Sequence, residues 1–148
     1  ELLLPKLKEI NQKINFKLSS NLYDLKDAIF IITATNAPET IIKPQYLSPG
    51  TIILDDAQPS DVDQSVLDMD DIIVIEAGLV HTPKIKTHFN FGFRDPYDNY
   101  SCLAEIMILS SIGHEGHFVV HRASLKDVDE IAKYSNLLNF HPAELQNF

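Results

Sequence analysis

The fold is decided by the stretch Ala28-Ile-Phe-Ile-Ile-Thr-Ala-Thr35, an unbroken apolar run that ends in small hydroxyl residues. A run of this kind between turn signals is typical of a strand that is buried on both faces of a parallel sheet. Two further apolar runs follow, at residues 51–54 and 71–77, with spacings of about twenty residues. The segments between the three runs have helical capacity, so the pattern indicates repeated strand–crossover–strand units. We therefore expect an α/β protein with a mainly parallel sheet.

Helical patterns flank the three expected strands on both sides. Residues 4–14 carry apolar side chains at steps of three and four, which predicts an amphipathic helix. Residues 99–112 are strongly apolar, and Gly113 would end a largely buried helix there. The candidate N-caps of this helix are Asp98 and Asn99. Ser124 is the expected cap of a last helix at residues 125–138.

The remaining segments carry weaker patterns. Short strands are expected at residues 15–18 and 118–121. Residues 81–98 contain prolines, a glycine and several aromatic residues without a regular period, so they are expected to form a long loop. Long loops in small domains are often functional.

Composition limits the possible classes of function. The 148 residues suit one domain spanning the whole chain, and 45% hydrophobic content excludes a disordered chain. The net charge of −9 makes nucleic acid a poor partner. No apolar run approaches the roughly 20 residues of a membrane span. The single cysteine, Cys102, excludes an internal disulfide and, without a signal-like segment, indicates the cytoplasm.

Two clusters resemble metal sites without having the required pattern. Residues 55–71 contain seven Asp, but an EF-hand loop also needs a Gly at its sixth position and a Glu at its twelfth. The histidines at 114, 117 and 121 have no Cys nearby, and Gly113 and Gly116 would break a helix that aligned them. No metal site is therefore expected. The histidines to which the sequence assigns no role are His81, His88, His114, His117 and His121.

The carboxyl ends of parallel strands are where open α/β sheets bind their ligands. Three strand tips are candidates here: Thr33-Ala34-Thr35-Asn36, Asp55-Asp56-Ala57 and Glu76-Ala77-Gly78-Leu79. Small residues at the first tip would let a planar ligand approach the backbone, and the hydroxyl groups could donate hydrogen bonds to it. The alternative is that these threonines and Gly78 only form turns.

Cys102 is the candidate nucleophile. It lies about three residues inside an expected helix N-terminus, where the helix dipole and free N–H groups stabilise a thiolate. Glu105 follows one turn later. A thiolate in such a place can accept an acyl group. The alternative is a small side chain that only packs against its neighbours.

These segments, in this order, resemble the dinucleotide-binding domain of the long-chain acyl-acyl-carrier-protein reductases, whose relatives are likened to shikimate and amino acid dehydrogenases. The most specific match is the stretch Tyr100-Ser-Cys-Leu-Ala-Glu-Ile-Met-Ile-Leu109, which looks like the family helix that carries the catalytic cysteine. The other matching segments are 28–38, 47–59, 73–80 and 129–142. The resemblance thus runs from the first helix to the C-terminus.

The resemblance implies an activity and a set of site residues. In the family, an acyl group passes from a carrier-protein or coenzyme A thioester to the cysteine, and NADPH then releases an aldehyde. Cys102 would be the acylated nucleophile, and Glu105 is a second catalytic candidate. The implied cofactor-binding residues are Thr33, Ala34, Thr35, Asp56, Gly78 and Leu79.

The family's glycine-rich strand–turn–helix has no counterpart in this sequence, which contains no G-x-G-x-x-G motif. That turn holds the pyrophosphate of the dinucleotide at a helix N-terminus. We therefore expect a partial Rossmann-like domain, the C-terminal portion of a larger protein, that binds NADP weakly or not at all. Two alternatives remain open: a hydride transfer like that of shikimate or amino acid dehydrogenases, with a structural Cys102, and a non-catalytic binding or assembly module.

A sheet without its first strands would leave residues 28–35 at an exposed edge. This segment is apolar and has no Lys or Glu to discourage pairing with another chain. We therefore expect a homo-oligomer.

Overall fold

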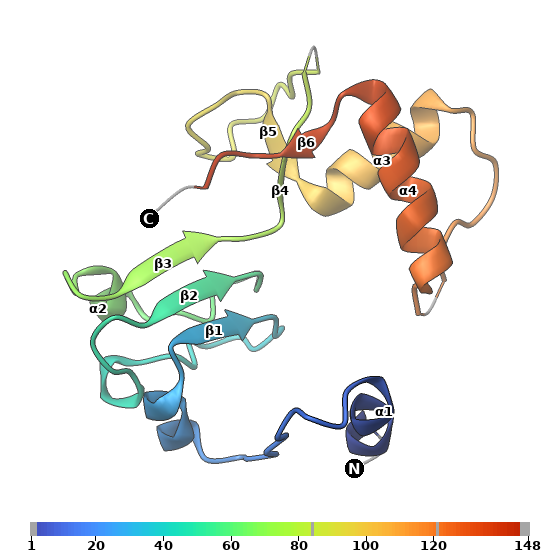
Figure 1. The fold of residues 1–148 in the computed structure, drawn as a ribbon. Coiled ribbons are helices and arrows are strands. Elements are labelled where there is room, and N and C mark those ends of the chain that lie inside the picture. Colours follow the sequence, from blue (N-terminus) through green and yellow to red (C-terminus); the bar gives the residue numbers. More distant parts are fainter. Residues whose placement is uncertain (1–2, 84, 121, 146–148) are drawn as a thin grey trace.

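The computed structural model describes residues 3–83, 85–120 and 122–145 (Figure 1). Its central feature is a parallel sheet of β1 (Phe30–Thr33), β2 (Ile52–Asp55) and β3 (Ile73–Glu76), in the order β1-β2-β3. The three predicted strands are thereby confirmed, each within a residue or two of the apolar run that predicted it. The fold is of the α/β class and is consistent with part of a Rossmann-like fold.

The connections between the parallel strands carry short helices. A 3-10 helix η1 (Leu22–Asp27) precedes β1, η2 (Pro44–Tyr46) lies between β1 and β2, and α2 (Gln64–Leu67) lies between β2 and β3. These segments cover one face of the sheet. The core on that face consists of Ile31, Ile42, Leu47, Ile53, Val62, Val66, Ile72 and Val74.

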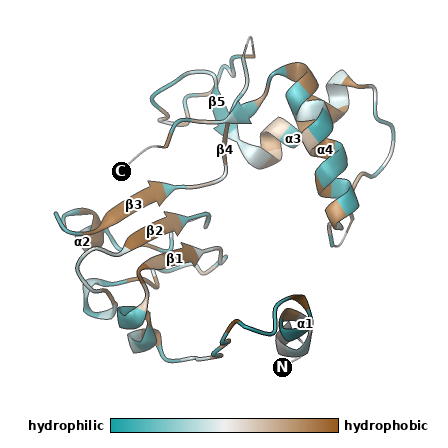
Figure 2. Cartoon of the chain, in the orientation of Figure 1, coloured by the Kyte–Doolittle hydropathy of each residue, from teal (hydrophilic) through white to brown (hydrophobic). Residues whose placement is uncertain are grey.

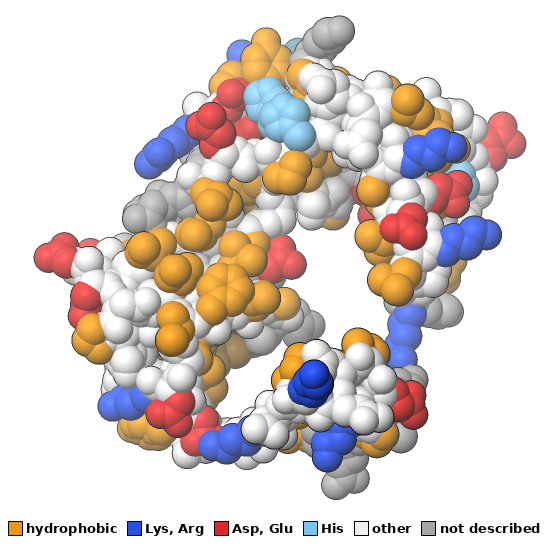
Figure 3. Space-filling model, in the orientation of Figure 1, with side chains coloured by type: hydrophobic (Ala, Val, Ile, Leu, Met, Phe, Trp, Pro, Cys, Tyr) orange, Lys and Arg blue, Asp and Glu red, His pale blue; other side chains and the backbone are white. Residues whose placement is uncertain are grey.

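No segment among the described residues covers the opposite face of the parallel sheet. Successive side chains of a strand point to opposite faces, and here both sets are apolar. Phe30 and Ile32 are 54% and 63% exposed, and Ile73 is also exposed. The apolar strands stand out in Figure 2, and hydrophobic side chains gather over β1–β3 in Figure 3. The expectation that these strands are buried on both faces is therefore wrong.

A second sheet, which the sequence did not predict, follows the first. It consists of β4 (Leu79–His81), β5 (Asp98–Tyr100) and β6 (His141–Pro142), paired antiparallel in the order β5-β4-β6. The described residues of the segment 82–97 form a loop, as expected, but His81 and Asp98, at the ends of the expected loop, belong to strands of this sheet.

Helices α3 (Ser101–Ser111) and α4 (Leu125–Leu138) pack beside the second sheet. Ala104 and Ile108 of α3 form a small core with Phe140, which follows α4, and Ile131, Tyr134 and Leu138 of α4 pack against it. The α4 helix confirms the prediction, and its capping box joins Ser124 and Asp127, each side chain accepting from the other residue's backbone N–H.

The α3 helix differs from its prediction in two respects. Its N-cap is Tyr100 rather than Asp98 or Asn99, because β5 runs to Tyr100 and the helix begins directly after it, at Ser101. It is also not largely buried, since only Ala104 and Ile108 lie in the core while Ile106 is 63% exposed. Residues 103–109 of this helix are apolar except Glu105, so the sequence pattern did not show which side faces the core.

The helix α1 (Leu3–Ile10) is shorter than the predicted span of residues 4–14 and lies apart from the sheets (Figure 1). Residues 15–18 and 118–120 form no strand, so both strand predictions are wrong for these positions. His121, the last residue of the second prediction, lies outside the described residues. Within the described part of the chain, no helix has the length and apolar character needed to cross a membrane.

Candidate functional site

The last residues of the three parallel strands lie in one row at the carboxyl edge of the sheet. The pairing places Thr33 of β1 beside Asp55 of β2, and Asp55 beside Glu76 of β3. A hydroxyl group and two carboxyl groups thus stand side by side at the edge where parallel sheets bind ligands.

Asp55 is buried, and three hydrogen bonds satisfy its carboxylate. The hydroxyl groups of Thr33 and Ser60 each donate to it at 2.6 Å, and the backbone N–H of Ala57 donates at 3.1 Å. The hydroxyl group of Thr33 is therefore used within the chain.

The hydroxyl group of Thr35 also forms a hydrogen bond within the chain. It donates to Oδ1 of Asp61 at 2.6 Å, and the backbone N–H of Thr35 donates to Oδ2 at 3.3 Å. Asp61 is 1% exposed, so this pair fastens the loop after β1 to the segment before α2. Ala34, between the two threonines, is exposed, and its methyl group cannot form such a hydrogen bond.

Of the two carboxyl groups in the row, Glu76 is the one whose ionisation its surroundings oppose. Partial burial raises its pKa, and the negative charge of the neighbouring Asp55 raises it further. Both causes act because burial removes water from the charged form and a like charge opposes ionisation. Glu76 therefore holds its proton to a higher pH than an ordinary glutamate.

Gly78 brings the β3–β4 turn against the loop after β2. It has φ +73°, and a Cβ at this position would lie 2.6 Å from Oδ1 of Asp56 and 3.6 Å from Oγ of Ser101. The carbonyl group of Gly78 also accepts a hydrogen bond from the backbone N–H of Ser101, the first residue of α3. Gly78 thus permits a three-way contact between two strand tips and the start of α3.

The contact at Gly78 positions Cys102, the second residue of α3. The thiol is exposed, and it stands in the first turn of a helix with 11 residues. The N-cap residue Tyr100 makes no side-chain capping bond, so the first-turn N–H groups have no side-chain acceptor there. Glu105 lies one helical turn further on and is half-buried.

The charges of Glu76 and Cys102 both act on the phenol group of Tyr100. Burial raises the pKa of its phenol, and the negative charges of Glu76 and Cys102 raise it further. The phenol is therefore a hydrogen-bond donor throughout the neutral pH range. Its ring also packs against Phe91 and Phe93, with centroids 5.5 and 4.9 Å away.

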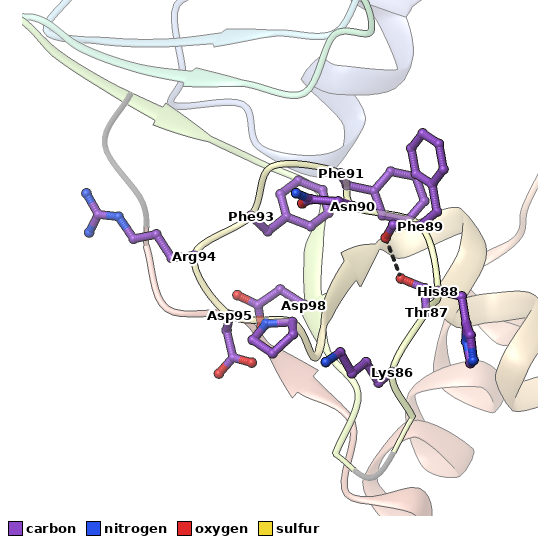
Figure 4. Close-up of a pocket in the computed structure, with 11 residues that line it drawn as sticks. Lys86, Thr87, His88, Phe89, Asn90, Phe91, Phe93, Arg94, Asp95 and Asp98 are labelled. Atoms are coloured by element: carbon purple, nitrogen blue, oxygen red, sulfur yellow. Dashed lines mark hydrogen bonds between the residues drawn. The ribbon is translucent and has the colours of Figure 1, made fainter.

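A hollow of about 420 Å³ lies between the row of strand ends and the loop 82–97. Asp55 and Glu76 line it from the sheet, and Phe93, Arg94 and Tyr100 line it from the loop and β5. A second hollow, of about 630 Å³, lies within the loop itself, where Phe89, Phe91 and Phe93 gather (Figure 4). The aromatic contacts hold the loop over the first hollow.

The structure brings some of the predicted site residues together and separates others. Asp56 and Gly78 meet next to Ser101, the first residue of α3, and Cys102 follows Ser101 in the chain. Leu79 is buried and pairs with Tyr100 in the second sheet, so it has a structural place. Among the described residues that line the 420 Å³ hollow, none is Thr33, Ala34, Thr35, Cys102 or Glu105.

The described residues do not form a complete dinucleotide site. The Rossmann-type pyrophosphate site is a helix N-terminus directly after a strand of the parallel sheet, but β3 is followed by β4, and the short α2 carries Asp63 at its N-cap. Asp55, Asp56 and Glu76 add negative charge at the same edge. The hydroxyl groups of Thr33 and Thr35 already donate to buried carboxylates. NADP does not fit this set of residues alone.

The sequence places Glu76 at a candidate strand tip, where it is the one charged residue in the run 72–77, but no role of its own was predicted for it. No role was predicted either for Arg94 or Tyr100, which line the hollow with Glu76. Arg94 gives no signal, since it lies in a segment without periodicity. No protein-family model matches the chain, and no curated protein matches it either.

Proposed function

We propose that this chain is part of an NADP-dependent oxidoreductase that reduces an acyl thioester to an aldehyde, with Cys102 as the residue that accepts the acyl group. The observation that supports the proposal is the place of the thiol. Cys102 is exposed in the first turn of α3, directly beside the point where two parallel-strand tips meet. This is the edge of the sheet at which α/β enzymes place their chemistry.

The acyl-transfer step uses groups of this chain. The Cys102 thiolate attacks the carbonyl carbon of a carrier-protein or coenzyme A thioester, and a new carbon–sulfur bond forms. The carrier's carbon–sulfur bond breaks, and the carrier thiol leaves with the proton that Cys102 gave up. Glu105, one turn along α3, is the candidate carrier of that proton. Tyr100 can donate a hydrogen bond to the carbonyl oxygen, because its raised pKa keeps the phenol protonated.

The cofactor enters the proposal only through the resemblance to acyl-acyl-carrier-protein reductases. When bound, NADPH would supply the hydride that converts the acyl thioester on the cysteine into an aldehyde. The residues that the structure describes do not form a complete site for the dinucleotide, so we assign none of them a step in that transfer. Acylation of Cys102 is the part of the activity that this chain can perform alone.

We also propose that the protein is cytoplasmic and that it forms a homo-oligomer. A reducing compartment keeps an exposed cysteine as a free thiol, which thioester exchange requires. Coenzyme A and carrier-protein thioesters are the matching substrates, and the acidic net charge of −9 makes nucleic acid a poor partner.

The test is acylation of the intact chain. Incubation with a long-chain acyl-coenzyme A should add one acyl group to the protein, detected by intact-protein mass spectrometry, and neutral hydroxylamine should remove it. Cys102→Ala should abolish the addition, because the chain has one cysteine. If the wild-type chain takes up no acyl group, or if Cys102→Ala takes it up equally, the proposed function is wrong and the non-catalytic module becomes the better interpretation.

A further inference from the structure

His81, Asp95 and Asp98 converge at one side of the second sheet, away from the proposed acyl site. We propose that these three residues form a binding site for one divalent transition-metal ion, for which zinc is the expected occupant. One imidazole nitrogen and two carboxylate oxygens are ligands that zinc accepts in proteins. The inference is independent of the proposed function.

The distances suit a shared ion. Nδ1 of His81 lies 2.9 Å from Oδ1 of Asp98 and 3.8 Å from Oδ2 of Asp95. One ligand atom from each of the three residues lies within 4.8 Å of the other two. Two ligands of a tetrahedral zinc ion are about 3.4 Å apart, for metal–ligand bonds of about 2.1 Å. The bound ion would replace the hydrogen bond of 2.9 Å between His81 and Asp98, and these two atoms would move apart by about 0.5 Å. A small rotation of the half-exposed Asp95 side chain would bring its Oδ2 to the ligand distance.

The backbone fixes the three residues in place. Antiparallel pairing of β4 and β5 sets His81 directly opposite Asp98. A turn closed by the hydrogen bond from the Asp98 N–H to the Asp95 carbonyl brings Asp95 to the same place. The Tyr97 N–H donates to Oδ1 of Asp95 at 2.8 Å, which orients the carboxylate and leaves Oδ2 facing His81. Hydrogen bonds of this kind orient metal ligands in known sites.

Burial and charge favour a cation at this position. Asp98 is only 4% exposed, and a second carboxylate, that of Asp95, stands close to it. Two neighbouring carboxylates repel each other, and a divalent cation between them reverses the sign of that interaction. The imidazole ring of His81 is held by stacking on His141, with ring centroids 4.9 Å apart.

A hollow at the cluster gives an ion access and room for a fourth ligand. His81, Asp95, Asp98 and Glu144 all line it, together with Arg94 and His141. Glu144 or a water molecule could complete the tetrahedron. Asp95 and Asp98 lie near each other in Figure 4, at the end of the loop where it enters β5. A bound ion would therefore fasten the end of the loop 82–97 to β4.

The test is a zinc titration of the chain after treatment with a chelator. Competition with a chromophoric chelator should show one high-affinity equivalent, and a cobalt-loaded sample should show the absorption of a tetrahedral site. His81→Gln and Asp95→Asn should each weaken binding by at least about ten-fold, because each removes one of three protein ligands. Asp95 is half-exposed, so its variant tests the site even if a change at buried Asp98 prevents folding.

Matched controls exclude three histidines outside the cluster. His88→Gln removes an exposed histidine of the same loop, and His114→Gln/His117→Gln removes the pair with helical-like spacing. All three of these substitutions should leave zinc affinity unchanged. The absence of a high-affinity equivalent would overturn the proposal. Binding that survives His81→Gln and Asp95→Asn, or that is lost with the control substitutions, would do the same.

Discussion

At the scale of single residues, Glu76 makes the stability of the fold depend on pH. Its pKa is higher in the folded chain than its ordinary value of 4.5, so the folded state binds this proton more tightly than the unfolded state. The free energy of unfolding therefore falls as pH rises from 4.5 through the folded pKa. The Asp groups whose pKa values are lowered from 3.8 change the free energy of unfolding below pH 3.8, which is outside this window.

The variant Glu76→Gln keeps the size of the side chain and removes its charge. We expect it to gain stability relative to the wild type as pH rises from 4.5 to about 7, because only the wild type must bury an ionising carboxyl group. Urea unfolding at a series of pH values measures the difference. A constant difference across the window, or one that reverses its sign, would contradict the raised pKa of Glu76.

At the scale of elements, Gly78 determines how closely the β3–β4 turn approaches the loop after β2. Gly78→Ala should destabilise the fold by about 1–3 kcal/mol, because a methyl group would meet Asp56 and the left-handed conformation disfavours alanine. Gly50→Ala is the matched control, since Gly50 has φ +84° and open space around it. Urea denaturation should show the larger loss for Gly78→Ala. Equal losses would mean that the close approach to Asp56 has no energetic weight.

The elements also show what sequence alone can predict. The three parallel strands were predictable because each is an apolar run bounded by turn residues. Which face they bury was not, since side chains such as Phe30 and Ile31 give no polar alternation. The second sheet was hidden because its strands have only two or three residues and β6 joins from 60 positions away in the chain.

Only part of the candidate site could likewise be predicted from the sequence. The row Thr33, Asp55 and Glu76 follows from a general rule about the carboxyl ends of parallel strands. The rule does not say whether a hydroxyl group is free, and the structure shows that Thr33 donates to a buried carboxylate. The cluster of His81, Asp95 and Asp98 exists only because β4 and β5 pair, so no spacing in the sequence indicates it.

At the scale of the whole molecule, the uncovered face of β1–β3 predicts self-association. Phe30, Ile32 and Ile73 expose an apolar surface, and β1 is an edge strand without a charged residue. Burial of such a surface against a second copy is favourable. The mass in solution, measured by light scattering, should be at least twice 16.7 kDa. Phe30→Lys/Ile32→Lys should reduce it to the monomer value.

The control for the assembly prediction is Val120→Lys. Val120 is 61% exposed and lies in the segment between α3 and α4, so a charge there should leave the assembly intact. A wild-type mass near 16.7 kDa would contradict the prediction, as would equal dissociation by the two kinds of variant.

We propose that the place of Cys102, rather than the mere presence of a thiol, gives the chain its acyl-transfer chemistry. Moving the thiol tests it most directly. In Cys102→Ala/Ser111→Cys the same helix carries its single cysteine at the opposite end, where Ser111 is exposed. The helix dipole there opposes a thiolate.

The decisive measurement is the initial rate of acylation by an acyl-coenzyme A, followed by mass spectrometry for both proteins under identical conditions. We predict that the wild-type chain is acylated at least about ten-fold faster than Cys102→Ala/Ser111→Cys, because both the helix end and the strand-tip contact favour the native position. Equal rates, with both proteins folded, would show that Cys102 is an ordinary surface thiol and would contradict the account.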